Sequence, residues 1–303
     1  MSPKLLAAAA LTFNAFLYGV SWWPFRALQD QGLHPLWSTA IIYAFAVLCL
    51  VLLRPRALRK LLLHPELWWL VLAAGLTNVG FNWAVTVGDV VRVVLLFYLM
   101  PAWVVLLAWP LLGERPGAGS LLRLILALAG VVIVLKTPSS AWPIPENLAD
   151  WLALMGGFCF ALTNILLRRL KHTPGESRML AMFGGGALMA GSVAIWGMSL
   201  GTIAAPPTPN LAWAGLALLI SLAFLAGNLS LQYGAAHLRA STTSIIMLSE
   251  VIFASISSVL LGTGELSVRT LAGGALILLA SLLAVLSSGA KRATINSATA
   301  THP

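Results

Sequence analysis

One carboxylate of the sequence lies deep inside an apolar segment. Glu250 falls about halfway along the stretch 241–261. A charged side chain at the centre of a bilayer costs about 2.5–3.5 kcal/mol on insertion scales, so a carboxylate kept there indicates a function. In that setting it can take up and release a proton; the alternative is a hydrogen-bonded or protonated Glu250 that only holds helices together. The other acidic residues all fall at the edges of apolar stretches or between them: Asp30, Glu66, Asp89, Glu114, Glu146, Asp150, Glu176 and Glu265.

Pairs of polar side chains recur four residues apart within other apolar stretches. They are Asn14 and Tyr18, Asn78 and Asn82, and Asn228 and Gln232. Residues four apart share one face of a helix, and an amide that faced lipid would lack hydrogen-bond partners. We therefore expect these faces to point into a helical bundle or a wet cavity. There they either line a solute path or join helices, a contact worth about 0.6 kcal/mol. Asn164, beside Thr163, is a weaker candidate of the same kind.

Several aromatic residues lie deep enough in apolar stretches to surround an apolar group of a solute, with ordinary packing as the alternative. They are Trp22, Trp83, Tyr98, Trp103 and Tyr233. Tryptophans at the ends of stretches are typical of membrane-interface anchors, and these are Trp68, Trp69, Trp142 and Trp151. Asp89 and Arg92 lie between two stretches, where they either pair locally or form part of an outer gate.

No lysine, arginine or histidine lies near the middle of an apolar stretch. A cavity for phosphorylated or multiply anionic solutes would need such cations, so neutral, zwitterionic or cationic solutes are favoured. The histidines lie in loops, at the ends of stretches or in the tail, and Cys49 and Cys159 lack metal-type spacing. The sequence therefore predicts no metal, no cofactor and no intramembrane enzyme, which would need a nucleophile with a base or a metal cluster.

The composition explains why polar groups stand out in this chain. Hydrophobic residues make up 59% of the 303 residues and charged residues 9%, against about 25% charged in soluble proteins. Crossing a bilayer takes about 20 apolar residues. Such stretches run about 5–25, 36–53, 67–87, 90–112, 121–135, 151–167, 179–200, 211–233, 241–261 and 270–286. The predicted fold class is therefore an all-α polytopic membrane protein of ten transmembrane helices.

Ten spans place both termini on one side of the membrane. Of the 18 basic residues, 14 fall on that side, and only Arg26, Arg92, Lys136 and Arg269 fall on the other. Because basic residues collect in cytoplasmic loops, both termini are predicted to be cytoplasmic, in an inner or plasma membrane. The same bias explains the net charge of +9 without nucleic acid, for which the chain has no stacking platform or basic groove. The expected partners are lipid and a small-molecule solute, with protons as an option; monomer and homodimer stay open.

The two halves of the chain resemble each other at an offset of 150 residues. Asn78–Ala84 corresponds to Asn228–Gly234, and Met100–Trp103 to Glu250–Phe253; each half then reaches a Gly-Glu pair, at Gly113-Glu114 and Gly264-Glu265. With five spans per half, the second copy must enter the membrane from the opposite side, an architecture of secondary transporters. The predicted domains are a first repeat at 1–137, a Pro-rich connecting loop at 138–150, a second repeat at 151–287 and a disordered cytoplasmic tail at 288–303.

On these residues the chain resembles the drug/metabolite transporter superfamily, specifically its EamA-type ten-helix exporters. The resemblance rests on the two Gly-Glu helix ends, on Leu99-Met100-Pro101 and Leu248-Ser249-Glu250, and on the segment Tyr18–Arg26. Val251 stands where a proline commonly follows the glutamate, so a kink there does not follow. The resemblance covers Leu5 to Leu286 and implies alternating-access transport of small metabolites, usually outward.

We therefore expect a secondary transporter that exports a small neutral, zwitterionic or cationic metabolite, either amino-acid-like or amine- and drug-like. Proton coupling would pass through Glu250. The alternative is a facilitative uniporter or channel-like permease without proton coupling.

Overall fold

The computed structural model describes residues 3–113, 117–136, 144–238, 246–247, 249–261, 267–280 and 282–283, and these residues are helical apart from turns and short loops. Several predicted features lie outside the described residues: Glu114, Glu265, Trp142, most of the connecting loop and the tail. The helices of the first half are α1 (Pro3–Val20), α2 (Trp22–Asp30), α3 (Pro35–Leu53), α4 (Arg56–Leu63), α5 (Leu67–Val87), α6 (Val90–Phe97), α7 (Met100–Leu112) and α8 (Ala118–Leu135). Those of the second half are α9 (Leu148–Arg169), α10 (Gly175–Ser199), α11 (Leu211–His237), α13 (Ser249–Leu260) and the helix Val268–Ala280.

Seven helical segments of the described chain are long and apolar enough to cross a membrane. They are Pro3–Asp30, Pro35–Leu53, Leu67–Val87, Val90–Leu111, Leu148–Arg169, Gly175–Ser199 and Leu211–Leu231. Shorter apolar helices, Leu121–Val134, Ser249–Leu260 and Val268–Ala280, coincide with the predicted fifth, ninth and tenth spans. The first span continues to Asp30 through a turn at Ser21, five residues beyond the predicted end at Phe25. The total of ten spans stays a prediction.

Short polar residues fix where several helices begin. The side chains of Asp89, Asn147 and Asn210 each accept a hydrogen bond from a backbone N–H three residues further along the chain. Such N-caps satisfy donors that have no partner within the helix. Gly113 ends α7 with a φ of 71°, in the left-handed region that glycine adopts without steric cost. The starts of α6, α9 and α11 and the end of α7 therefore follow from local chemistry.

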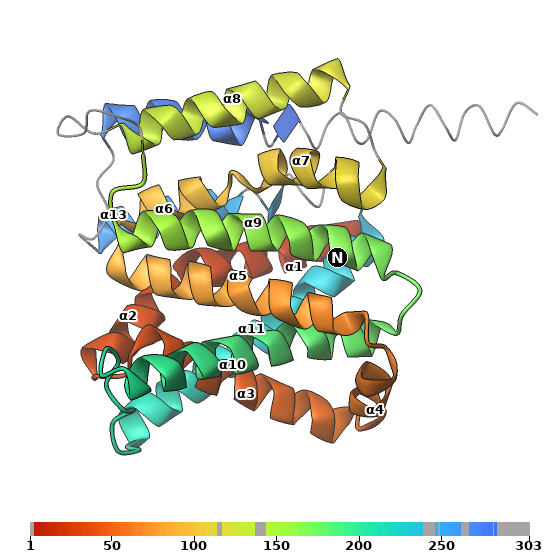
Figure 1. Cartoon of the computed structure of the whole chain (residues 1–303), viewed down its shortest axis with the longest axis vertical. Coiled ribbons are helices and arrows are strands. Elements are labelled where there is room, and N and C mark those ends of the chain that lie inside the picture. Colours follow the sequence, from red (N-terminus) through yellow and green to blue (C-terminus); the bar gives the residue numbers. More distant parts are fainter. Residues whose placement is uncertain are drawn as a thin grey trace, which may run out of the picture.

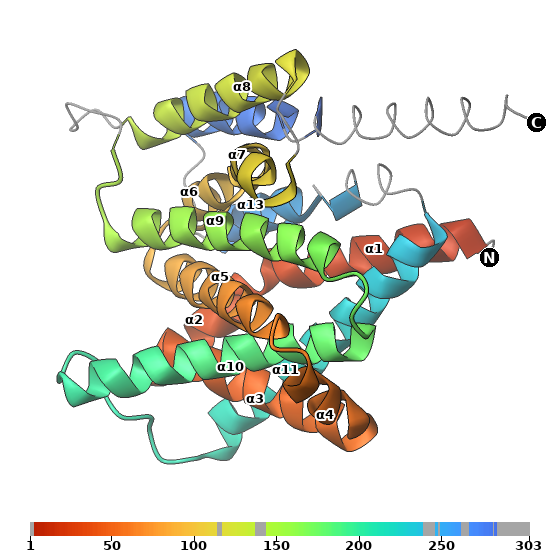
Figure 2. The same ribbon diagram turned by 45° about the vertical axis from the view of Figure 1, so that its right-hand side comes forward.

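The helices of the two halves are interleaved. In both views α9, α5 and α10 lie in successive layers, and α8 lies with the helix Val268–Ala280 at one edge of the bundle (Figures 1 and 2). The first-half helix α5 packs between α9 and α10 of the second half, and α1 packs against α11 and α13. The core is therefore built at contacts between the halves rather than inside each half separately.

The first helices of the two halves run in opposite directions. Helix α1 starts at the labelled N-terminus and α9 starts at the other end of the bundle, next to the connecting segment (Figure 2). The end that holds Pro3 and Arg169 is called the N-terminal end below. The end that holds Lys136 and Leu148, which flank the connecting segment, is called the linker end.

Glycines allow α5 and α10 to touch through their backbones. A Cβ atom on Gly185 would lie 2.1 Å from the carbonyl oxygen of Val71, and one on Gly75 would lie 2.4 Å from that of Gly185. Next in the sequence, Gly186 lies against the ring of Tyr43. The Gly184-Gly185-Gly186 segment thus permits close helix contact at two of its positions.

Candidate solute and proton site

Glu250 lies where helices of both halves meet. It is in the first turn of α13, and its Oε2 accepts a hydrogen bond from the hydroxyl of Tyr98 at 3.2 Å. The same hydroxyl is 3.5 Å from the carbonyl oxygen of Met247. Tyr98 is 4% exposed and follows the last residue of α6, just before α7 begins at Met100. The carboxylate of the second half is therefore held by a phenol of the first half, at a break between two helices.

Helix α1 covers another side of this carboxylate. Its backbone comes so close that a Cβ atom on Gly19 would lie 2.7 Å from the carbonyl oxygen of Glu250. Tyr18 lies within electrostatic range of Glu250, and its ring stacks on Phe224 of α11 with 5.0 Å between centroids. Glu250 therefore lies close to two first-half segments, helix α1 and the break between α6 and α7.

Asn14, one turn before Tyr18, has an unused acceptor. Its side chain is fully buried and donates through Nδ2 to the carbonyl oxygen of Gly227 on α11 at 2.7 Å. Its Oδ1 has no hydrogen-bond partner among the described residues. A buried acceptor without a donor costs about 1–3 kcal/mol, so a donor group on a bound solute would be favoured at this position.

The Asn78 and Asn82 side chains point to one neighbour, as their spacing predicts. The hydroxyl of Tyr43 donates to Asn78 Oδ1 at 2.5 Å, and Asn82 Nδ2 donates to Thr39 Oγ1 at 3.2 Å. Both partners belong to α3. This polar face therefore joins α5 to α3 within the first half.

A double-mutant cycle tests whether the Thr39–Asn82 contact stabilises the fold. Thr39→Val and Asn82→Ala are each expected to lower the free energy of unfolding by about 0.6 kcal/mol, and at most about 1.7, the range for hydrogen bonds between membrane helices. The double variant should lose less than the sum, because both changes remove one bond. Unfolding in mixed detergent measures this, with Thr12→Val as control, since the exposed Thr12 hydroxyl bonds only to its own helix. Strictly additive losses would contradict the stabilising role.

Among the second-half amides, the described hydrogen bond of Asn164 stays within its own helix. Asn164 Nδ2 donates to the carbonyl oxygen of Phe160 on its own helix at 3.0 Å, Asn228 is half-buried on α11, and the side chain of Gln232 lies outside the described part. Asn14 and Asn164 are themselves 150 residues apart, the offset that relates Asn78 to Asn228. Asn14 and Asn164 are therefore a further pair related by the internal repeat.

The deep aromatic residues are distributed among separate partners. Trp22 Nε1 donates to Ser257 Oγ at 2.9 Å, and ring contacts join Trp83 to His34, Trp103 to Phe158 and Tyr233 to His237. Among the described contacts of the five candidates, it is Tyr98 that donates a hydrogen bond to Glu250. The sequence shows how deep an aromatic residue lies in a span, but it does not show which neighbour the ring contacts.

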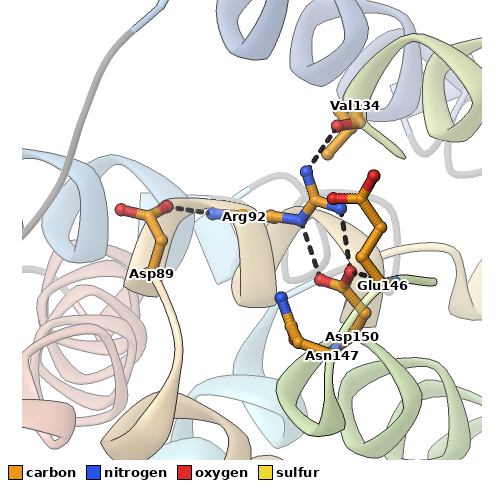
Figure 3. A network of polar contacts seen from close by, with 6 residues as sticks. All are labelled: Asp89, Arg92, Val134, Glu146, Asn147 and Asp150. Carbon is orange, nitrogen blue, oxygen red and sulfur yellow. Dashed lines mark hydrogen bonds and ion pairs between the residues drawn. The ribbon is translucent and has the colours of Figure 1, made fainter. Parts of the chain in front are cut away.

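Asp89 and Arg92 take different roles at the linker end (Figure 3). Asp89 Oδ1 accepts from the backbone N–H of Arg92 at 2.7 Å and so caps α6. The guanidinium group turns instead to Asp150 on α9, with Nε–Oδ1 at 2.7 Å and Nη2–Oδ2 at 2.8 Å. The local contact is thus through the backbone, whereas the ion pair reaches the second half. Sequence reasoning missed Asp150, which is 58 residues from Arg92.

Comparison with known proteins agrees with this architecture. Among solved structures, one crystal structure of a protein is 17% identical, with a TM-score of 0.56, covering 92% of this chain and 96% of that chain; this likeness shows the fold alone. No curated protein matches. The model of the EamA-like transporter family matches residues 5–136 and 147–286, once in each half. Together with the apolar helices, the match indicates an integral membrane transporter of a small solute. Because the two matches cover most of the chain, the protein belongs to the EamA-like transporter family of the drug/metabolite transporter superfamily.

Proposed function

We propose that the protein is a secondary exporter of a small neutral, zwitterionic or cationic solute, working by alternating access, with Glu250 as its proton-coupling group. The observation that carries the proposal is the hydrogen bond from Tyr98 of the first half to Glu250 of the second. Adding a proton to this carboxylate changes a contact between the two halves directly. The free energy of protonating Glu250 therefore differs between conformations in which the halves are arranged differently. Such a difference is what coupling requires.

The chemistry of Glu250 and Asn14 favours a solute that carries an amine. An ionised Glu250 attracts an ammonium group, and the free Oδ1 of Asn14 accepts a hydrogen bond from a neutral or charged donor. When Glu250 is protonated, the attraction for a cation is lost and the solute is released. In an exporter of this kind a proton enters from outside as the solute leaves, so an acidic exterior drives export.

The proposed topology is two inverted five-helix repeats with both termini in the cytoplasm of an inner or plasma membrane. The opposite directions of α1 and α9 support the inversion. The excess of basic residues on the side of the N-terminal end supports the orientation. The linker end then faces the outside.

A solute panel in proteoliposomes tests the proposal. The panel contains amino acids, aliphatic and aromatic amines and quaternary ammonium compounds, with a sugar phosphate as the disfavoured class. We expect saturable counterflow of an amine-bearing solute, and net transport that responds to an imposed pH gradient. Saturable counterflow without any pH response would favour the uniporter. Transport that never saturates would indicate a channel, because alternating access saturates and a pore does not.

A further inference from the structure

Arg92 ties together three segments at the linker end (Figure 3). Its guanidinium group makes two hydrogen bonds to the carboxylate of Asp150 on α9. Its Nη1 donates to the carbonyl oxygen of Val134, near the end of α8, at 2.9 Å. Helices α6 and α8 belong to the first half and α9 to the second, so one side chain connects the two halves.

The ion pair is shielded and geometrically matched. The side chain of Asp150 is 1% exposed and that of Arg92 18%. Two parallel N–H···O bonds make this the bidentate arrangement, which is stronger and more specific than a single contact. Asp150 also accepts from the backbone N–H of Glu146 at 3.1 Å, while its own N–H donates to Asn147 Oδ1. Removing either partner would leave a shielded charge unpaired, which is strongly unfavourable.

Other contacts show that the halves meet at this end. Trp22 Nε1 donates to Ser257 Oγ on α13 at 2.9 Å, and Trp37 Nε1 donates to the carbonyl oxygen of Ala204 at 3.1 Å. Every residue of α6 except Arg92 is buried. The structure therefore captures a conformation in which the linker end is joined, and the one ionic contact among these polar contacts is Arg92–Asp150.

The internal repeat does not reproduce this charge. At the offset of 150 residues, Thr242 corresponds to Arg92 in the sequence. In an inverted repeat, contacts at one end of the first copy are mirrored at the other end by the second copy. A neutral threonine cannot form the equivalent ion pair, so the second copy does not repeat this contact in its sequence.

We propose that Arg92 and Asp150 form an outer latch, an ion pair between the halves that holds the linker end closed and separates when the transporter opens outward. The latch rests on the proposed function in one respect, that the linker end opens to the outside. It requires nothing about the solute or about Glu250. Because arginine stays protonated at all physiological pH values, the latch favours the outward-closed conformation independently of proton coupling.

The test measures access to the linker end without a solute. A reporter cysteine replaces Ser257 in a Cys49→Ala, Cys159→Ala background, and right-side-out vesicles are treated with a membrane-impermeant maleimide. Arg92→Gln and Asp150→Asn are each expected to raise the labelling rate about tenfold, as a shift of the conformational equilibrium by one order of magnitude would. Arg92→Lys, which keeps the charge but loses the bidentate geometry, should give an intermediate rate.

Arg269→Gln is the matched control. Arg269 also reaches the first half at the linker end, but it is exposed, and its bond within the described residues is to the carbonyl oxygen of Lys136. Its loss should leave the labelling rate unchanged.

Three results would overturn the latch. One is unchanged labelling in folded Arg92→Gln and Asp150→Asn protein. Another is a loss of thermal stability in these variants with no change in labelling, which would make the pair a structural staple. The third is faster labelling only in inside-out vesicles, which would reverse the orientation.

If the neutral variants fail to fold, the charge swap Arg92→Asp with Asp150→Arg is tested in their place. It should fold and label slowly. None of these measurements involves solute or pH, so they leave the role of Glu250 to its own test.

Discussion

Replacing Glu250 with glutamine is expected to reduce pH-driven solute export to the level of empty vesicles. Glutamine has the same shape and still offers an oxygen to the hydroxyl of Tyr98, so the fold should persist. The amide cannot exchange a proton near neutral pH, and the coupling step is lost. Counterflow of solute without net proton movement should continue only at higher solute concentrations. The loaded transporter can still change its direction of opening, but the neutral amide no longer attracts the ammonium group. Pyranine-filled proteoliposomes measure the accompanying proton flux.

Glu66→Gln is the control for loss of a carboxylate. Glu66 lies between α4 and α5, outside the spans, within 3.1 Å of His64 and 3.6 Å of His172. A hydrogen bond from its own backbone amide, together with those to the two histidines, lowers the pKa of Glu66. Its carboxylate therefore stays ionised across the neutral range, and its removal should leave the pH response intact. A Glu250→Gln transporter with the full pH response would remove the proton from the proposed mechanism.

The spans were predictable because the bilayer leaves the chain few choices. Backbone groups in lipid must bond within the segment, so an apolar stretch of sufficient length becomes a helix. The stretch predicted at 67–87 is α5 with the same bounds. The break within the fourth apolar stretch, between α6 and α7 at Tyr98 and Leu99, was not predicted. It precedes Pro101, which has no N–H to bond the carbonyl oxygen of Phe97 and which is tolerated in the first turn of α7.

The candidate site was predictable in its polar faces and not in its partners. Helical spacing correctly places Asn78 and Asn82 on one face of α5, but it does not show that this face meets α3. The Arg92–Asp150 pair depends on how α6 and α9 approach, which local patterns do not encode. Residue type and spacing thus identify groups that need partners, whereas the packing of helices distant in sequence decides which partners they find.

Gly185→Ala is expected to destabilise the protein by about 1–3 kcal/mol, the usual cost of inserting extra carbon into a packed interior. The added Cβ would lie 2.1 Å from the carbonyl oxygen of Val71 and 3.0 Å from the backbone nitrogen of Gly75. Both obstructing atoms are backbone, so no side-chain rotation relieves the overlap and α5 and α10 must move apart. Small residues at such crossings are what allows membrane helices to approach closely.

Gly184→Ala separates this contact from the effect of the substitution itself. A Cβ atom on Gly184 would meet nothing within 4 Å, yet both changes replace glycine by alanine in the same helix and gain the same helix propensity, up to about 1 kcal/mol. The midpoint of thermal unfolding in detergent should fall for Gly185→Ala and stay or rise for Gly184→Ala. Equal midpoints would mean that α5 and α10 do not touch at Gly185. Since α5 belongs to the first half and α10 to the second, that result would contradict the interleaved packing of the halves at this contact.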